Sequence, residues 1–119
     1  GLCALAFNVH MSLLGEKGLR QLAAENHRLA CLAADKLAAV PGVTVLNDSF
    51  FNEFTIRLGQ DARAIVRKLA DDGILAGVSL GRLYPGNDAL AEGLLVTLTE
   101  TTSEEDIDAL CAALKEVLA

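Results

Sequence analysis

Residues 53–58 alternate between polar and apolar side chains, and this pattern restricts the fold more than any other feature of the chain. The apolar members are Phe54, Ile56 and Leu58, and the polar members are Glu53, Thr55 and Arg57. A period of two is typical of a β-strand that buries one face and leaves the other in water. The pattern therefore predicts a half-buried strand in a sheet with one wet face.

Three other segments are expected to be strands. VTVLND at residues 43–48 precedes the alternating strand, and the turn-forming Asn47, Asp48 and Ser49 suggest that the two pair as an antiparallel hairpin. ILAGV at residues 74–78 and GLLVTLTE at residues 93–100 are the expected third and fourth strands. The strands thus occur as two adjacent pairs along the chain.

Helical periodicity marks the segments around these strands. Residues 16–40 repeat apolar side chains at i, i+3, i+4 and i+7, and the Pro41–Gly42 pair ends this helix. A shorter helix follows Asp61, a plausible N-cap, and ends at Gly73. The last helix is expected to begin with a capping box formed by Thr102 and Glu105, with three acidic residues near its positive end.

The order of elements is helix, helix, strand, strand, helix, strand, strand, helix. Paired strands separated by a helix favour hairpins over parallel crossovers. The sequence therefore predicts an α+β fold: a mostly antiparallel four-stranded sheet with helices packed on one face. A length of 119 residues fits one domain.

The opening GLCALAFNVHMSLLG, residues 1–15, is apolar on almost every face of a helix that is expected to end at Gly15. A helix that is apolar all round is normally buried all round. A domain of this size can cover one side of it, so the other side is expected to face a neighbour. We therefore expect a fragment of a larger chain, or a tight oligomer.

Composition excludes several classes of function. The net charge of −6 argues against nucleic acid and anionic membrane surfaces as partners, because both require a basic footprint. No apolar run reaches the roughly 20 residues of a membrane span. The widely spaced Cys3, Cys31 and Cys111 contain no C-x-x-C motif and are interpreted as reduced thiols of a cytoplasmic protein.

The segment GVSLGRLYPG, residues 77–86, is the main candidate for a binding loop. It lacks the lysine of a Walker motif, and a strand rather than a helix follows it, so a phosphate loop is not expected. It is either a plain connection with a turn at Pro85–Gly86 or a contact loop. Arg82 and Tyr84 favour contact, because a guanidinium binds a carboxylate through two hydrogen bonds and a phenol offers a flat amphipathic surface.

No catalytic group is identified from the residues alone. His27 and Cys31, four residues apart, form half a metal site at most, so no metal is expected. The lysines lie on polar helix faces rather than in an apolar pocket. Asn26 interrupts the apolar stripe of its helix and is expected to be a satisfied core amide or a helix-edge residue.

Several collinear blocks resemble one family. SLLGEKGLRQLAAEN, FFNEFTIRL and DDGILAGVSLGRLYPGNDALAEGLLVTLTETTSEEDIDAL are similar to the C-terminal part of glycine dehydrogenase (decarboxylating) subunit 1, one half of the split P-protein of the glycine cleavage system. The opening segment is similar to the helix that leads out of that family's large domain. The resemblance covers nearly the whole chain.

This resemblance implies that residues 1–119 are the small C-terminal domain of a fold type I pyridoxal-phosphate enzyme, with residues 1–15 as the lead-in helix from the large domain. The full enzyme would decarboxylate glycine and transfer the aminomethyl group to lipoylated H-protein. Pyridoxal phosphate would be attached in the companion subunit 2 of a cytoplasmic heterotetramer. The fragment itself is expected to hold no cofactor and to be inactive alone.

The resemblance also indicates candidate contact residues for substrate or partner: Asn52, Glu53, Arg82, Tyr84 and Glu100. One departure is the link GNDALAEG, residues 86–93, which is longer than the tight connection expected from the family. The resemblance therefore does not define the conformation of this loop or the direction of the Arg82 and Tyr84 side chains. Two alternatives remain open. A free-standing module that binds an amino acid would not need the apolar opening helix, whereas a dimerisation domain would bury that helix against its own copy.

Overall fold

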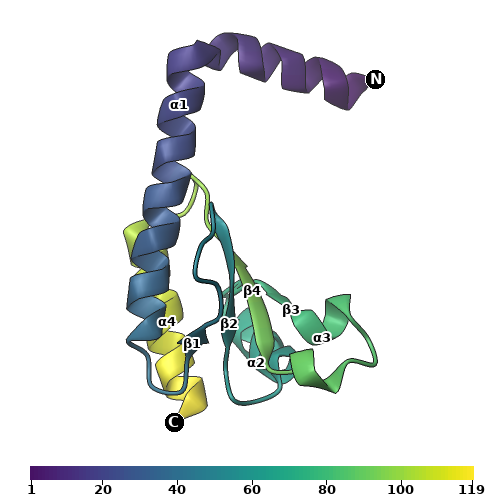
Figure 1. The fold of residues 1–119 in the computed structure, drawn as a ribbon, viewed down its shortest axis with the longest axis vertical. Helices are drawn as coiled ribbons and strands as arrows, with labels where there is room; N and C mark the ends of the chain where they lie inside the picture. The colour runs from purple at the N-terminus through teal and green to yellow at the C-terminus, as the bar shows by residue number, and fades with distance from the viewer.

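Four strands form one antiparallel sheet in the computed structural model, which describes residues 1–119 (Figure 1). They are β1 (Thr44–Val45), β2 (Glu53–Arg57), β3 (Val78–Ser79) and β4 (Gly93–Thr97), in the order β1-β2-β4-β3 across the sheet. The central β2 and β4 pair over their full lengths, whereas the two edge strands have only two residues each. The predicted antiparallel sheet and the β1–β2 hairpin are confirmed.

The alternation in β2 has the predicted consequence. Phe54 and Ile56 are buried, whereas Glu53 and Arg57 are exposed on the opposite face. On β4, Leu94 and Val96 are buried on the same side as the apolar residues of β2, with which they pair in register. One face of the sheet therefore belongs to the core.

Three helices contribute to this core. They are the second part of α1 (Leu2–Ala38), α2 (Ala62–Asp71) and α4 (Glu104–Leu118). Their inward residues join Phe54, Ile56 and Leu94 in one hydrophobic cluster: Leu29, Ala30, Ala33, Ala34, Leu37, Ala62, Ile65, Leu69, Ile107 and Leu114. The predicted α+β arrangement, with helices on one face, is confirmed.

Gly15 divides α1 into two helical parts. Its φ of 62° and ψ of −176° are not helical, and glycine reaches this region because it has no Cβ. The predicted helix end at Gly15 is therefore confirmed. Figure 1 shows the first part turning sharply away from the axis of the second, and we call residues 2–14 the N-terminal arm.

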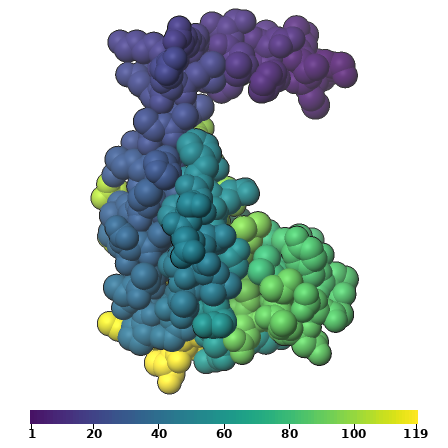
Figure 2. All heavy atoms as spheres, viewed as in Figure 1, coloured from purple at the N-terminus to yellow at the C-terminus, as the bar shows by residue number.

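The N-terminal arm has little contact with the rest of the chain (Figure 2). All of residues 1–10 are exposed, with 81% of Leu2 and 62% of Phe7 accessible to solvent. We expected this chain to cover one side of the helix, and it covers neither side over these residues. The arm lies beyond the sheet because the second part of α1 extends past the sheet before it reaches the bend at Gly15 (Figure 1).

The third strand is shorter and later than predicted. Ile74 is not in a strand, because its N–H donates to the carbonyl of Leu69 at 2.8 Å and completes the end of α2. Gly77, with φ of 136°, passes so close to the carbonyl oxygen of Leu95 that a side chain there would overlap it. Extended pairing therefore begins only at Val78.

The capping box of α4 lies one residue later than predicted. Ser103 Oγ accepts from the N–H of Asp106 at 3.1 Å, and a carboxylate oxygen of Asp106 accepts from the N–H of Ser103 at 2.8 Å. Thr102 instead closes the preceding turn, since its N–H donates to the carbonyl of Thr99 at 2.9 Å. The predicted acidic first turn is confirmed, and the hydrogen bond from Ser103 N–H lowers the pKa of Asp106.

Candidate functional site

Residues 80–92, which we call the Arg82 loop, join β3 to β4 as predicted, but they contain regular structure. It forms one helical turn, α3 (Leu80–Leu83), and the 3-10 helix η1 (Asp88–Leu90). Between them, Asn87 N–H donates to the carbonyl of Tyr84 at 3.2 Å. Gly86 has the positive φ, 88°, that a type II turn requires after proline. The predicted turn at Pro85–Gly86 is confirmed.

Close packing holds this loop against the sheet and α2. Arg63 of α2 donates from Nη2 to the carbonyl of Gly81, and Ala62 N–H donates to the carbonyl of Ala91 at 3.0 Å. Gly93 gives room for Leu80, because a Cβ at that glycine would lie 2.6 Å from Leu80 Cδ1. The loop is therefore a shaped projection with several anchors rather than a loose connection.

The side chains of the two candidate loop residues point to solvent. Tyr84 is 57% exposed, the adjacent Leu83 is 48% exposed, and Arg82 is exposed without an ion pair inside the chain. A small polar hollow of about 200 Å³ lies beside Tyr84, and Arg82 does not line it. Arg82 is therefore available to a group outside this chain and is not part of a pocket within it.

Asn52, Glu53 and Glu100 lie at the other end of the sheet. The side-chain Nδ2 of Asn52 donates to the backbone carbonyl of Leu98 at 3.1 Å, and the backbone carbonyl of Asn52 accepts from Leu98 N–H at 2.9 Å. Glu53 accepts a hydrogen bond of 3.1 Å from Thr97 Oγ1. Glu100 is exposed in the turn after β4. Asn52 thus extends the ladder between β2 and β4, whereas the two glutamates remain accessible.

The five predicted contact residues therefore do not form one site. Because β3 and β4 are antiparallel, the residues that come after β3, including Arg82 and Tyr84, lie near the Gly93 end of β4. Asn52, Glu53 and Glu100 lie at its Thr97 end. Five residues of strand separate these ends, a length of about 13 Å at about 3.3 Å per residue. Sequence position alone does not indicate this separation.

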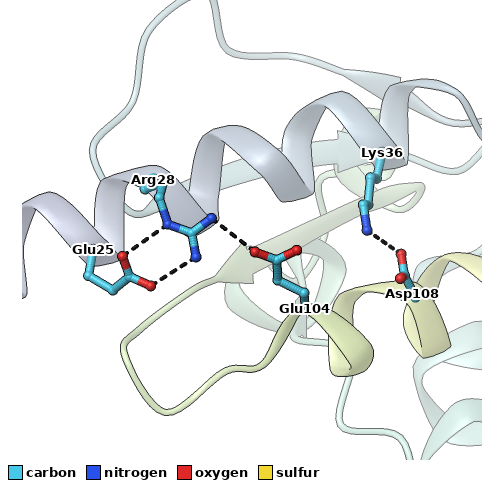
Figure 3. A network of polar contacts seen from close by, with 5 residues as sticks. All are labelled: Glu25, Arg28, Lys36, Glu104 and Asp108. Atoms are coloured by element: carbon cyan, nitrogen blue, oxygen red, sulfur yellow. Dashed lines mark hydrogen bonds and ion pairs between the residues drawn. The ribbon is translucent and has the colours of Figure 1, made fainter.

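Ion pairs on the surface fix α4 against α1 (Figure 3). Arg28 lies between Glu25 and Glu104, at 2.9 Å and 3.0 Å, and Lys36 pairs with Asp108. The hydrogen bonds that Arg28 donates to Glu25 and Glu104 raise its pKa, and the hydrogen bond that Lys36 donates to Asp108 raises the pKa of Lys36. Because all of these side chains reach solvent, salt screens their attraction. The network joins helices and offers no catalytic group.

Two polar residues of the second part of α1, Asn26 and His27, have surroundings that the sequence did not fully predict. Asn26 Oδ1 is buried without a hydrogen-bond partner in the chain, so this amide is not fully satisfied. His27 contacts both Cys31 and the backbone of Phe51. The spacing of four residues indicates the first contact, but nothing in the sequence indicates the second.

No group of three or more His, Cys, Asp or Glu side chains is placed to hold a metal ion. No helix combines the length and apolar character that a membrane crossing demands.

The chain is similar to one family over nearly its whole length. The family described as Glycine cleavage system P-protein matches residues 1–114. A probable glycine dehydrogenase (decarboxylating) subunit 1 from Erythrobacter litoralis is 76% identical over all 119 residues, and one from Rhizorhabdus wittichii is 61% identical. The chain spans about a quarter of these relatives, 26% of each.

Solved structures show the same fold. A crystal structure of glycine decarboxylase (P-protein) of the glycine cleavage system, in inhibitor-bound form, matches 92% of this chain and 24% of its own, with 35% identity and a TM-score of 0.80. A NifS-like protein from Rickettsia africae and a C-DES mutant with glycine linked to its pyridoxal-phosphate cofactor have TM-scores of 0.67 and 0.62, both at 21% identity. These two share the fold of type I pyridoxal-phosphate enzymes, which confirms the predicted fold class.

Proposed function

The chain belongs to the glycine cleavage system P-protein family, and on that premise we propose that it is the small C-terminal domain of a first subunit of glycine dehydrogenase (decarboxylating). The observation that carries the proposal is the 76% identity, over all 119 residues, to a probable subunit 1 of which this chain spans 26%. Within the complete assembly, the domain contributes to glycine decarboxylation and to aminomethyl transfer to lipoylated H-protein. Alone it is inactive.

Pyridoxal phosphate supplies the electron sink for decarboxylation in the proposed assembly. The lysines of this chain do not fit its covalent attachment: Lys17, Lys68 and Lys115 are exposed on helices, and Lys36 pairs with Asp108. Attachment through a Schiff base requires a lysine whose pKa is depressed by burial or a cationic neighbour. We therefore assign the attachment to the companion subunit and derive no chemical step from this chain.

Two surfaces are proposed to join this domain to the rest of the assembly. The N-terminal arm, with Leu2, Leu5 and Phe7 exposed, packs on the large domain of the same subunit, because burial of apolar area is the main driving force for such contacts. The Arg82 loop faces substrate, subunit 2 or H-protein. An unpaired guanidinium beside an exposed phenol is the composition typical of an interface anchor.

The test uses the complete subunit with subunit 2 and lipoylated H-protein, and it measures exchange of labelled bicarbonate into glycine. Arg82→Ala is compared with Arg67→Ala, because Arg67 is also an exposed arginine and lies on α2. Loss of a charged interface partner costs about 2 kcal/mol or more, so we expect about a thirtyfold loss of activity for Arg82→Ala and none for Arg67→Ala.

Other outcomes separate the parts of the proposal. Equal activity of both variants would reduce the Arg82 loop to a strand connection and leave the family function intact. A complete assembly with no exchange activity would contradict the function itself. Tight binding of a free amino acid by this chain alone would favour the sensor alternative, for which the exposed N-terminal arm has no role.

A further inference from the structure

Pro85 leaves one carbonyl of the Arg82 loop without a partner in its own helical turn. In an α-helix, the carbonyl of each residue accepts from the N–H four residues later. Leu80 follows this rule, because Tyr84 N–H donates to its carbonyl at 2.8 Å. The next carbonyl, that of Gly81, would need the N–H of residue 85, and proline has none. Gly81 is buried, so its carbonyl requires a donor from another part of the chain.

Arg63 supplies this donor from the first turn of α2. Its Nη2 donates to the carbonyl of Gly81, and its Nε lies 3.4 Å from the position that a Cβ on Gly81 would occupy. On the other leg of the loop, the Cα of Ala91 lies 3.6 Å from the same position. Gly81 therefore lies in close packing between the guanidinium and the returning chain.

The same end of α2 holds the other leg of the loop. Ala62 is fully buried, and its N–H donates to the carbonyl of Ala91 at 3.0 Å. The side chain of Asp61 caps α2 and accepts from the backbone N–H of Arg63 at 2.9 Å. This cap fixes the backbone from which the Arg63 side chain extends. The first turn of α2 thus binds both legs of the Arg82 loop.

The contact with the loop accounts for an arginine at position 63. Arg63 takes part in none of the ion pairs of the chain. A cation in the first turn of a helix also faces the positive end of the helix dipole, which is unfavourable. The carbonyl of Gly81 is the acceptor found for its side chain, and a charged donor forms a stronger hydrogen bond than a neutral one.

The carbonyl that Arg63 binds belongs to the peptide unit between Gly81 and Arg82. A peptide unit is planar, so a hydrogen bond to its oxygen also fixes the N–H and the Cα of Arg82. A single helical turn such as α3, four residues long, is not stable by itself. The direction of the Arg82 side chain therefore depends on the contact that Arg63 makes one residue earlier.

We propose that Arg63 is a positioning residue, which holds α3 in its helical turn and so directs the Arg82 guanidinium toward an anionic group outside the chain. This inference rests on the proposed function, in which Arg82 contacts substrate, subunit 2 or H-protein. Arg63 acts through Arg82 and makes no contact of its own there. Without Arg63, the turn adopts several conformations, and ordering it again on contact weakens the interaction.

Hydrogen exchange of the complete first subunit, followed by mass spectrometry, tests the hold on the loop without any enzyme activity. Arg63→Ala should speed exchange around the Tyr84 amide about tenfold, because the bond of that amide to Leu80 opens with the loop. Arg63→Lys keeps a donor for the Gly81 carbonyl and should remain within about threefold of the natural rate. The control Arg67→Ala, on the same helix, should leave the rate unchanged.

Activity of the same variants, assembled with subunit 2 and lipoylated H-protein, tests the positioning role. Arg63→Ala should lower the exchange of labelled bicarbonate into glycine about tenfold, and Arg63→Lys should recover most of this loss. The double variant Arg63→Ala/Arg82→Ala should be no less active than Arg82→Ala alone, because a side chain that is absent needs no direction.

Different results would overturn different steps. An unchanged exchange rate at Tyr84 in Arg63→Ala would exclude the hold on the loop. Losses of activity that add in the double variant would show that Arg63 makes a contact of its own. An Arg63→Lys variant no better than Arg63→Ala would exclude the hydrogen bond to Gly81 as the cause.

Two further outcomes separate this inference from its premise and from a general loss of structure. Full activity of Arg82→Ala would contradict the proposed contact, and the positioning role would fall with it even where hydrogen exchange supports the hold. If Arg63→Ala also speeds exchange in α4, the fold has opened. Arg63→Met, which keeps the apolar stem but lacks the donor, then decides by the same two measurements.

Discussion

The two parts of α1 differ in apolar content, and the more apolar part is the exposed one: 10 of the 13 residues of the N-terminal arm are apolar, against 12 of the 23 residues 16–38. In the second part, Leu29 is 3% exposed and packs with the sheet, whereas Leu2 in the N-terminal arm is 81% exposed. The second part concentrates its apolar residues on one stripe, so a single sheet face is enough to cover them. The arm distributes them around the helix, and one sheet cannot cover it. Apolar content alone therefore does not decide burial; its distribution around the helix does.

Truncation of one leucine in each part of α1 should give the largest contrast. Leu37→Ala removes a fully buried side chain and should lower the free energy of unfolding by about 2–5 kcal/mol. Leu13→Ala, at a position 81% exposed, should change it by less than about 0.5 kcal/mol. Urea unfolding of this chain measures both. A comparable loss for Leu13→Ala would show that the arm packs against this domain.

Loss of the capping box of α4 should also destabilise the second part of α1, because α4 packs against that part. Ser103→Ala should cost about 1 kcal/mol, since it leaves the N–H of Asp106 without its acceptor. Thr102→Ala should cost less, because Thr102 Oγ1 makes only a long contact of 3.5 Å to Thr99 N. Thermal unfolding compares the two, and the reverse order would contradict the position of the cap.

Gly15→Ala acts on the bend that separates the two parts. Alanine strongly favours the helical region over the φ and ψ of Gly15, so the helix should straighten across residue 15. The core should keep its stability to within about 0.5 kcal/mol. Small-angle X-ray scattering should give a radius of gyration above the present 16.0 Å. An unchanged radius would show that contacts other than glycine geometry set the bend.

Acid should weaken the second part of α1 and α4 in a defined pH range. The hydrogen bond from Arg28 lowers the pKa of Glu25, and that from Ser103 N–H lowers the pKa of Asp106. A carboxyl whose pKa is lower in the folded state stabilises the fold above its unfolded pKa, about 4, and loses this effect as pH falls through the folded value. The midpoint temperature of thermal unfolding should therefore decrease as the pH is lowered below about 4. Asp106→Ala should make this decrease smaller. An equal drop in the variant would exclude Asp106 as a contributor.

Local patterns predicted much of the architecture. The alternation of Phe54 and Ile56 predicted the buried face of β2, and Gly15 and Asp61 marked a helix break and an N-cap that the structure contains. These features depend on residues within one turn or one strand of each other. The misplaced cap at Thr102 shows the limit of such patterns: Thr102 closes the turn that begins at Thr99, and the next residue, Ser103, caps the helix instead.

The candidate residues show what patterns in the chain do not contain. Arg82 and Glu100 appeared as members of one contact set, but the antiparallel register of β4 places them at opposite ends of the sheet. The contact of His27 with Phe51 spans 24 positions and depends on how the β1–β2 connection folds over α1. Side-chain chemistry and spacing do not determine such distances; the packing of elements does.

Sequence patterns were enough to predict the order and type of most elements, the exposed and buried faces of β2, and the resemblance to the P-protein family. Those properties follow from local periodicity, turn chemistry and collinear blocks of residues. The late start of β3 and the contact of His27 with Phe51 became known only from the folded structure. Both depend on contacts between residues distant in the chain, where close packing leaves one arrangement among several that the local preferences permit. The direction of the N-terminal arm follows from the φ and ψ of Gly15, and a glycine in the sequence indicates a break without fixing its angle.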